Sequence, residues 1–263
     1  MSFKNKVVWI TGASSGIGKA LALSFSKLEA KIIISSRKRE ALEEVKNLCA
    51  HPENVKIVTL DLEDYTNLGI AVSNAISKFE KIDILINNGG ISQRALAVDT
   101  DIFVDKRFMD INYMGSMALT KGVLPHFIDN NSGHFVTITS VSGKLGTPKR
   151  SAYAASKHAL HGFFDCLRAE VYKENIAVTL VTPGYIQTNL SVNALTGDGN
   201  KMNKIDTSLS QGIPADVFAK KLIKAIEKRK NEVAIGGFKE MASLYIKRFF
   251  PNLLTKLVRN VNA

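Results

Sequence analysis

Short apolar runs that alternate with helical stretches are the feature of this chain that most constrains its fold. The runs hold mostly β-branched residues, and the stretches between them repeat apolar residues with the spacing of an amphipathic helix. Buried strands that alternate with helices predict a parallel sheet covered on both faces, and right-handed crossovers make that sheet doubly wound. The expected strands lie at residues 6–11, 31–35, 55–60, 82–86, 134–139, 176–181 and 232–235. We therefore expect a single-domain α/β fold of Rossmann type, with about seven strands and helices on both faces.

The 263 residues suit one large domain, and no repeat or linker divides them. We assign residues 1–237 to the Rossmann-type domain and residues 238–263 to a C-terminal tail. Helices are expected at residues 17–28, 38–48, 64–79, 102–127, 151–172 and 214–228.

The composition fits a globular protein, since 45% of the residues are hydrophobic and 22% are charged. No apolar run is long enough to span a membrane, and the N-terminus lacks the apolar core of a signal peptide. Cys49 and Cys166 have no metal-ligand spacing, so we interpret them as free core thiols in a reducing compartment. His158 and His161 have no partner that would complete a metal site. We expect a cytoplasmic protein without a bound metal.

The positive charge is concentrated at one end of the chain. The net charge is +11, and residues 220–263 hold eleven Lys and Arg against three Glu. This uneven distribution argues against a general nucleic-acid-binding surface.

A glycine-rich turn follows the first expected strand and precedes the first expected helix. Its spacing is G-x-x-x-G-x-G, and glycines at such a turn let a pyrophosphate approach the N-terminus of the helix. We therefore predict a dinucleotide site at this turn, formed by Gly12, Ser14, Ser15, Gly16, Ile17 and Gly18.

The end of the second strand predicts which dinucleotide binds. An Asp or Glu at this place usually binds the ribose 2′-hydroxyl of NAD, but this chain has Ser35-Ser36-Arg37-Lys38-Arg39. Arg37 offers a fork of donors suited to a 2′-phosphate. We therefore expect NADP(H) as the cofactor.

Tyr153 and Lys157 are four residues apart in the helical stretch 151–172. Residues with this spacing lie on one face of a helix, and a nearby cation favours the phenolate form of a tyrosine. Tyr153 is therefore a candidate general acid or base.

The glycine turn and the Tyr153–Lys157 pair, in this order, resemble the short-chain dehydrogenase/reductase family, and the resemblance covers roughly residues 5–235. It points to an NADP-preferring member similar to carbonyl reductases. It implies that Asn112, Ser140, Tyr153 and Lys157 form the catalytic tetrad, with Ser142 as a weaker candidate for the serine. It also implies further cofactor contacts from Asp61, Leu62, Asn87, Gly89, Tyr153, Lys157, Pro183, Gly184, Ile186 and Thr188. Gly89 replaces the alanine usual in the family, which we expect to add backbone freedom without changing the chemistry.

The resemblance also implies a mechanism for reducing a ketone or aldehyde to an alcohol, or for the reverse reaction. Tyr153 donates a proton to the carbonyl oxygen while a hydride from NADPH reaches the carbonyl carbon. Ser140 binds that oxygen, Lys157 assists Tyr153 and contacts the nicotinamide ribose, and Asn112 completes a proton relay through a water molecule.

The polar stretch at about residues 189–213 is too long for an ordinary connection and corresponds to the substrate loop of the family. Apolar residues in and near it predict an apolar substrate that is lipid-, steroid- or acyl-like. The candidates for the pocket wall are Leu145, Gly146, Tyr185, Leu190, Val192, Leu195 and Met202.

The tail 238–263 combines an apolar helical face with basic residues on its polar side. Such a helix either lies in a membrane interface, making peripheral contact with lipid, or packs on the domain or on a neighbouring subunit. The resemblance further implies a homodimer or homotetramer built on the helices around Tyr113 and Tyr153.

Three other functions remain open from the sequence. One is an NAD-dependent alcohol dehydrogenase of the same family, which Arg37 disfavours. The second is a non-catalytic NADP(H)-binding sensor or scaffold, which has no need of a complete tetrad. The third is a peripheral membrane module with a vestigial enzyme fold, for which the tail is the only argument.

Overall fold

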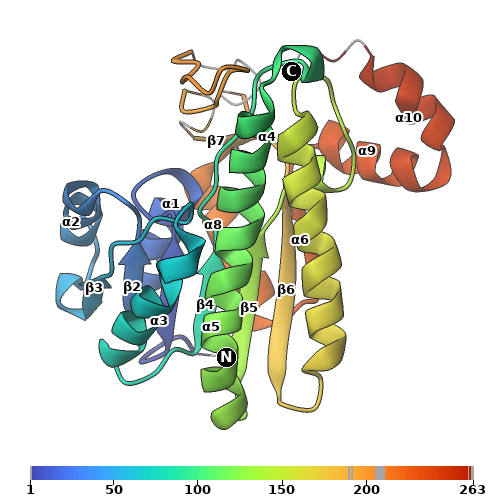
Figure 1. Cartoon of the computed structure of the whole chain (residues 1–263). Helices are drawn as coiled ribbons and strands as arrows, with labels where there is room; N and C mark the ends of the chain where they lie inside the picture. The colour runs from blue at the N-terminus through green and yellow to red at the C-terminus, as the bar shows by residue number, and fades with distance from the viewer. Residues whose placement is uncertain (1, 189, 191, 205–210, 260, 262–263) are drawn as a thin grey trace.

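The computed structural model describes residues 2–188, 190, 192–204, 211–259 and 261, and a seven-stranded sheet forms the centre of this part of the chain (Figure 1). The strand order is β3-β2-β1-β4-β5-β6-β9, and each neighbouring pair is parallel. The strands are β1 (Val7–Thr11), β2 (Lys31–Ser35), β3 (Val55–Ile57), β4 (Ile84–Asn87), β5 (Gly133–Ile138), β6 (Ile176–Pro183) and β9 (Glu232–Ile235). The prediction of a single-domain Rossmann-type fold is confirmed.

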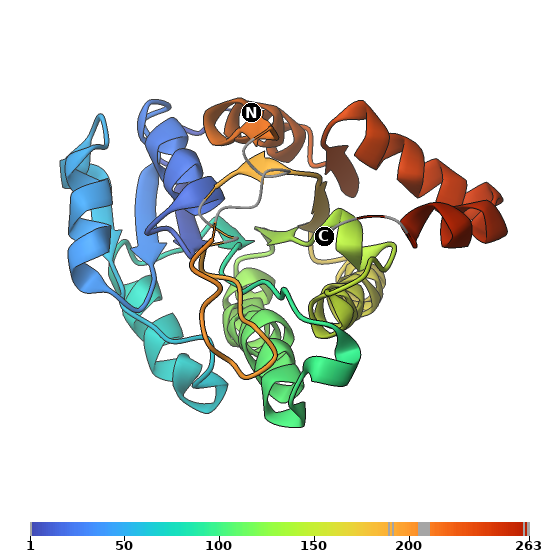
Figure 2. The ribbon, with the colours of Figure 1, turned by 90° about the horizontal axis from the view of Figure 1, so that it is seen from above.

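Alternating side chains on the strands build two separate apolar cores, one on each face of the sheet. Val8 and Ile10 of β1 belong to the core shared with α1 (Gly16–Ser26), α2 (Arg39–Asn47) and α8 (Ala215–Glu227). Val7 and Trp9 belong to the other core, which they share with α3 (Leu68–Ser77), α5 (Gly115–Asp129) and α6 (Ser151–Glu170). Figure 2 shows these two helical layers on either side of the sheet. This arrangement follows from the period of two along a strand.

The observed elements differ from the expected ones mainly where the chain bends. The third strand was expected to reach residue 60, but β3 ends at Ile57, although Val58 and Leu60 still donate backbone hydrogen bonds toward the second strand. The helix expected over 64–79 is a 3₁₀ turn, η2 (Tyr65–Asn67), followed by α3. The region 102–127 divides into α4 (Ile102–Phe108), a π-helical turn η4 (Met109–Met114) and α5.

Several short elements were not expected from the sequence. They are the 3₁₀ turns η1 (Pro52–Asn54), η3 (Ala97–Asp99) and η5 (Val141–Gly143), and the parallel pair β7 (Ile186–Gln187) and β8 (Ile213–Pro214). The pair β7–β8 closes the two ends of the polar stretch 189–213, of which residues 189, 191 and 205–210 lie outside the described residues.

The C-terminal residues form two short helices, α9 (Phe238–Phe249) and α10 (Pro251–Val258), which extend beyond β9 at the side of the domain (Figure 2). Pro251 stands at the start of α10, where its missing N–H and fixed φ are tolerated. Across the described ranges, we find no helix with the length and apolar character needed to cross a membrane.

The two cysteines differ in their surroundings. Cys49 is buried and free, as expected, and burial raises the pKa of its thiol. Cys166 is also free but exposed, because its position on α6 faces solvent. The expectation that it is a core thiol is wrong.

A buried hydrogen bond ties the first two strands together. The indole N–H of Trp9 donates to Ser35 Oγ at 2.8 Å, and both residues are fully buried. We predict that Ser35→Ala lowers the free energy of unfolding by about 1–3 kcal/mol, because the indole N–H loses its partner. Urea unfolding followed by tryptophan fluorescence measures the change.

The control for this experiment is Ser73→Ala, at an exposed position on α3. It should change the free energy of unfolding by less than about 0.5 kcal/mol. Equal effects of the two substitutions would show that the buried hydrogen bond adds nothing.

Candidate functional site

The carboxyl ends of the strands open into one cleft of about 1570 Å³. It lies at the ends of the neighbouring strands β1 and β4, where the strand order reverses: the chain continues from β1 to β2 on one side and from β4 to β5 on the other. Rossmann-type sheets bind ligands at this point. Most residues predicted from the sequence for cofactor binding and catalysis line it: Gly12, Ser14, Ser15, Gly16, Ile17, Arg37, Asp61, Leu62, Gly89, Ser140, Tyr153, Lys157, Pro183, Gly184, Ile186 and Thr188. Three predicted residues, Gly18, Asn87 and Asn112, lie behind this lining.

The turn after β1 has the shape of a phosphate cradle. Gly12 and Gly16 have φ values of 63° and 53°, a conformation that favours glycine. A Cβ atom on Gly18 would lie 2.4 Å from the carbonyl oxygen of Gly12, so Gly18 packs beneath the turn. The first N–H groups of α1 have no capping side chain, and Ser14 and Ser15 stand beside them in the cleft. These features fit the pyrophosphate of a dinucleotide.

Asn88 holds this turn from the neighbouring strand. Its side-chain amide donates to the carbonyl oxygens of Thr11 (2.9 Å) and Gly12 (3.2 Å). In return, Thr11 Oγ accepts hydrogen bonds from the backbone N–H groups of Asn88 and Gly89, each at 3.0 Å. Asn88 and Thr11 were not predicted as site residues, although Thr11 directly precedes the glycine turn and Asn88 lies between the predicted residues Asn87 and Gly89. Asn87 is buried and donates a hydrogen bond to Thr120 Oγ1 at 2.9 Å.

Gly89 has a steric role that the sequence did not indicate. Its φ is not in the left-handed region, so backbone freedom does not explain it. A Cβ atom at this position would lie 2.5 Å from Leu62 Cδ1. The missing side chain therefore gives Leu62 room at the wall of the cleft.

The end of β2 presents positive charge to the cleft. Ser36, Arg37 and Lys38 all line it, and the side chains of Arg37 and Lys38 are exposed to solvent. Asp61 stands nearby at the end of the third strand segment, where its carboxylate accepts a hydrogen bond from the backbone N–H of Glu63.

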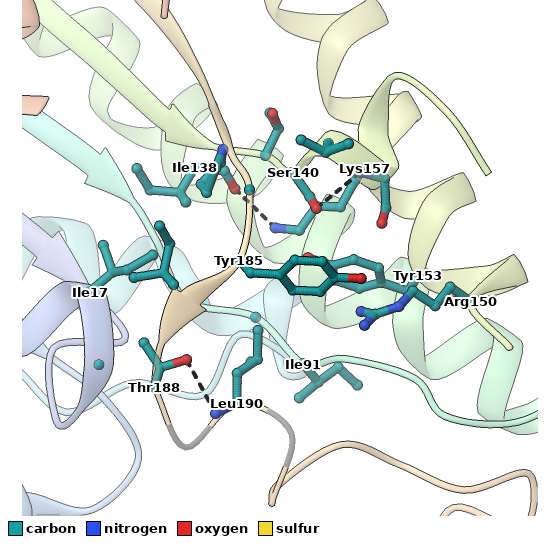
Figure 3. Close-up of a pocket in the computed structure, with 18 of the residues that line it drawn as sticks. Ile17, Ile91, Ile138, Ser140, Arg150, Tyr153, Lys157, Tyr185, Thr188 and Leu190 are labelled. Carbon is teal, nitrogen blue, oxygen red and sulfur yellow. Dashed lines mark hydrogen bonds between the residues drawn. The ribbon is translucent and has the colours of Figure 1, made fainter. Parts of the chain in front are cut away.

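Tyr153 and Lys157 lie on the same face of α6, as their spacing predicted, and both are buried at the wall of the cleft (Figure 3). The ammonium nitrogen of Lys157 lies 6.0 Å from the centre of the Tyr153 ring. It donates a hydrogen bond to the carbonyl oxygen of Ile138 at 2.9 Å. Burial lowers the pKa of Lys157 from 10.5 to about 8.

Ser140 follows β5 and reaches the same wall, since β5 and α6 are joined through the turn η5. Its hydroxyl oxygen accepts a hydrogen bond from the backbone N–H of Ser142 at 3.0 Å. This contact fixes the oxygen at the edge of the cleft, where Figure 3 shows it with Tyr153 and Lys157.

Asn112 supports the site from behind, within the π-helical turn η4. Its side chain exchanges two hydrogen bonds with the backbone of Ile91, at 2.8 and 3.1 Å, and donates to Ser156 Oγ at 3.0 Å. Gly90 lies between Asn112 and Lys157, since a Cβ atom there would be 2.8 Å from Asn112 Oδ1 and 3.6 Å from Lys157 Nζ. A π-helical turn at such a position often marks a functional site.

Two further residues at the head of α6 were not predicted. The side-chain oxygen of Gln93 accepts hydrogen bonds from the backbone N–H groups of Ala152 (2.9 Å) and Tyr153 (3.2 Å), and so caps the helix. Arg150 is buried at the cleft with its guanidinium carbon 6.0 Å from the centre of the Tyr153 ring. Only the position of Arg150 beside the tyrosine motif could have drawn attention to it.

The two histidines of α6 differ in their surroundings. His158 Nδ1 lies 2.8 Å from the carbonyl oxygen of Ala154. His161 is buried, neither of its ring nitrogens has a hydrogen-bond partner in the described part of the chain, and burial lowers its pKa to about 4. Within the described ranges, no three His, Cys, Asp or Glu side chains gather as a metal site.

The polar stretch 189–213 contributes part of the wall. Leu195 pairs with the segment after β4 through backbone hydrogen bonds to Ser92 (2.8 Å) and Arg94 (2.9 Å). Of the predicted pocket residues, Leu145, Tyr185, Leu190 and Leu195 line the cleft. Val192, Met202 and Gly146 are described by the structure but lie outside the lining, so their assignment is not supported.

The C-terminal helices pack on the domain and form part of the cleft wall. Packing on the domain was one of the arrangements that the sequence left open for this tail. The carboxylate of Glu240, on α9, accepts a hydrogen bond from the backbone N–H of Tyr185 at 3.2 Å. Gly184 and Gly236 approach so closely here that a Cβ atom on Gly184 would lie 2.9 Å from Gly236 Cα. The residues of α9 and α10 that line the cleft include Ser243, Ile246, Leu254 and Val258.

The low pKa of Lys157 predicts a pH dependence of stability. The pKa in the folded state lies below its ordinary value, so between about pH 8 and 10.5 the unfolded chain binds more protons and stability rises with pH. Relative to a Lys157→Met variant without cofactor, the wild type should therefore gain about 3 kcal/mol between pH 7 and pH 10.5. Urea unfolding across this range measures the difference.

The exposed Lys121→Met variant is the control, and its stability should follow that of the wild type at each pH. If the free energy of unfolding of Lys157→Met changed with pH in parallel with that of the wild type, the buried charge of Lys157 would not destabilise the fold.

Known proteins were compared with this sequence and structure. A family model described as short chain dehydrogenase matches residues 6–198. The chain is 41% identical over 260 residues to the mouse protein "Dehydrogenase/reductase SDR family member 7B", covering 97% of this chain and 80% of the relative. It is 43% identical over 256 residues to "Dehydrogenase/reductase SDR family protein 7-like" from Anopheles gambiae, covering 94% of this chain and 80% of the relative.

Solved structures show the same architecture. A short-chain dehydrogenase from Streptomyces avermitilis superposes with a TM-score of 0.83 at 26% identity, over the whole of both chains. A short-chain dehydrogenase/reductase from Burkholderia phymatum, solved in complex with NAD, has a TM-score of 0.85 at 21% identity over 96% of each chain. The match of the family model, the relatives of similar sequence and the shared fold agree: the chain belongs to the short-chain dehydrogenase/reductase family of oxidoreductases.

Proposed function

We propose that this oxidoreductase uses NADPH to reduce a ketone or aldehyde to an alcohol, or runs the same reaction in reverse, on an apolar substrate. The observation that carries the proposal is one cleft that contains the glycine turn, Arg37, Ser140, Tyr153 and Lys157 together. A phosphate cradle, a positive charge at the ribose position and a proton donor beside an ammonium group are what such a reaction requires.

Tyr153 is the proton donor in this proposal, and Ser140 binds the carbonyl oxygen of the substrate. Developing negative charge on that oxygen needs donors fixed in advance, and both residues are held on rigid elements at the cleft wall. Lys157 stabilises the phenolate that Tyr153 becomes, because its ammonium group is buried nearby. Its low pKa allows it to pass a proton on near neutral pH.

Asn112 acts in this proposal mainly as a positioning residue. Its hydrogen bonds to Ile91 and Ser156 hold the segment after β4 against α6, beside Lys157. The proton relay through a water molecule that the family resemblance implies for Asn112 stays a prediction.

The dinucleotide, when bound, supplies the hydride. The turn from Gly12 to Gly18 would hold its pyrophosphate, and Asp61 and Leu62 its adenine. Arg37, with Lys38 beside it, would bind the 2′-phosphate. Two proteins of similar fold were solved in complex with NAD or NADH, but at 21% and 23% identity the similarity supports the fold alone. No carboxylate stands at the end of β2 to favour NAD, so NAD-dependent alcohol oxidation is the weaker alternative.

The substrate side of the cleft is mostly apolar. Leu145, Tyr185, Leu190 and Leu195 come from the loops, and Ile246 and Leu254 from the C-terminal helices. This lining favours a lipid-, steroid- or acyl-like carbonyl compound. We further propose a cytoplasmic homodimer or homotetramer, built on the helices around Tyr113 and Tyr153.

The first experiment compares NADPH and NADH oxidation with ketones, aldehydes, steroids and 3-oxoacyl esters. We expect turnover with NADPH, and we expect Arg37→Asp to lower the ratio of kcat/KM for NADPH over NADH by about 10² or more, because a carboxylate repels the 2′-phosphate. Arg39→Asp, outside the cleft on α2, is the control and should leave the ratio unchanged. An unaltered ratio for Arg37→Asp would show that the 2′-phosphate is bound elsewhere.

The second experiment tests the proton donor. Tyr153→Phe should lower kcat by about 10²–10⁴ while NADPH still binds, because the ring remains and only the hydroxyl is lost. The exposed Tyr172→Phe variant, at the far end of the same helical stretch, should keep full activity. Tight NADPH binding with no turnover of any compound by the wild type would favour the non-catalytic sensor.

A further inference from the structure

The two C-terminal helices expose a group of large apolar side chains. Phe238, Tyr245 and Phe249 follow each other at helical spacing on α9, and they are 88%, 70% and 67% exposed. Phe250 is 62% exposed at the junction of the helices, and Leu253 and Leu257, four residues apart on α10, are 49% and 51% exposed. We call these six residues the α9–α10 face. Soluble domains rarely expose so many large apolar side chains in one place unless a partner covers them.

The charges around the α9–α10 face are almost all positive. The exposed basic residues on these two helices, or directly after α10, are Lys239, Lys247, Arg248, Lys256 and Arg259. Glu240 is the only acidic residue in the sequence 238–263, and its carboxylate binds the backbone of Tyr185 inside the fold. The face is therefore apolar with a cationic margin.

This charge distribution favours a lipid surface over a second copy of the chain as the partner that covers the α9–α10 face. A two-fold contact between copies of the α9–α10 face would bring its cations against the same cations of the partner. An anionic bilayer, by contrast, neutralises the cations and takes up the aromatic and aliphatic side chains. Neither helix is long enough to span a bilayer, since α9 has 12 residues and α10 has 8.

We propose that the α9–α10 face docks on anionic lipid bilayers, with both helices lying in the interface. The apolar side chains enter the boundary between headgroups and acyl chains, and the basic residues contact the lipid phosphates.

The same helices connect this face to the cleft. Ile246, Leu254 and Val258 line the cleft from the inner side of α9 and α10. Two residues of the face, Phe238 and Leu257, line the cleft as well. A bilayer docked on the outer side therefore lies at the rim of the cleft. This places the substrate among carbonyl compounds that partition into membranes, a step that rests on the proposed function.

Vesicle flotation of the full-length protein, without cofactor or substrate, tests the docking itself. We expect binding to vesicles of phosphatidylcholine with about a third phosphatidylglycerol, weak binding to phosphatidylcholine alone, and release at about 1 M salt. The double variants Phe249→Ser/Phe250→Ser and Lys247→Glu/Arg248→Glu should each lower binding about tenfold or more. These four residues lie outside the cleft lining, so turnover of a water-soluble ketone should not change.

Matched controls lie on the other side of the molecule. Leu48→Ser/Ile70→Ser removes two exposed apolar residues near α2 and on α3. Lys78→Glu/Lys121→Glu reverses two exposed charges, at the C-terminal end of α3 and on α5. Both should bind vesicles like the wild type. Equal binding by wild type and face variants, or no binding to anionic vesicles, would overturn the proposal. So would a dimer in sedimentation experiments that Phe249→Ser/Phe250→Ser abolishes, since a second copy would then cover the face.

A separate comparison tests the connection to the cleft. With a long-chain ketone held in anionic vesicles, the face variants should lose about tenfold or more of the wild-type rate while keeping their rate with a water-soluble ketone. Equal rates with both ketones would overturn membrane delivery of the substrate. Because flotation needs no turnover, failure of the oxidoreductase proposal and failure of the docking proposal are distinguishable.

Discussion

The hydrogen bonds between Asn88 and the end of β1 are the interaction on which the rest of the site depends. In this sheet the chain leaves β1 toward β2 on one side, and β4 lies on the other side, so a crevice opens between the two strand ends. The Asn88 amide and the Thr11 hydroxyl bridge that crevice at its base. Together with the backbone hydrogen bond from Ala13 N–H to the carbonyl oxygen of Ser35 (3.1 Å), they hold the glycine turn in a conformation that glycine tolerates.

From Asn88 the segment after β4 passes through each functional part of the cleft. Ile91 is fixed by Asn112, Gln93 caps α6 at Tyr153, and Arg94 pairs with Leu195 of the polar stretch 189–213. One stretch of chain thus links the glycine turn, the first turn of α6 and the wall of the cleft at Leu195. A shift of this stretch would move all three together. Its buried side chains Ser92, Gln93 and Arg94 form hydrogen bonds with both backbone and side-chain groups of the protein, which holds the stretch in place.

The buried ammonium group of Lys157 lowers the stability of the fold at this site. A protonated lysine loses hydration when it is buried, and the Ile138 carbonyl replaces only part of it. An apolar side chain would fit this wall at lower cost. The chain instead has a cation beside the phenol of Tyr153 at this position. The packing of the surrounding sheet offsets the stability that is lost by burying the charge.

Much of this arrangement could be predicted from the sequence because it is local. The turn from Gly12 to Gly18 and the pair Tyr153–Lys157 depend on spacing along one strand-to-helix turn and one helix, and their placement in the cleft was foreseen. Gln93, Asn88 and Arg150 were missed because their partners are distant in sequence or come together only after folding, as the separation of 59 positions from Gln93 to Ala152 illustrates. Gly89 was misinterpreted for the same reason, since its neighbour is the side chain of Leu62 and not its own turn.

The C-terminal helices show why a sequence pattern alone could not choose between packing and membrane contact. An amphipathic pattern has one apolar face, and we expected that face either to contact a membrane or to pack against protein. In the structure the pair α9–α10 has apolar residues on two sides: Ile246, Leu254 and Val258 line the cleft, whereas Tyr245, Phe249 and Phe250 are exposed outside it. The inner side, anchored by Glu240 to Tyr185, completes the cleft, whereas the outer aromatic residues remain in water. Both arrangements predicted from the sequence are therefore compatible, since they concern different sides of the same two helices.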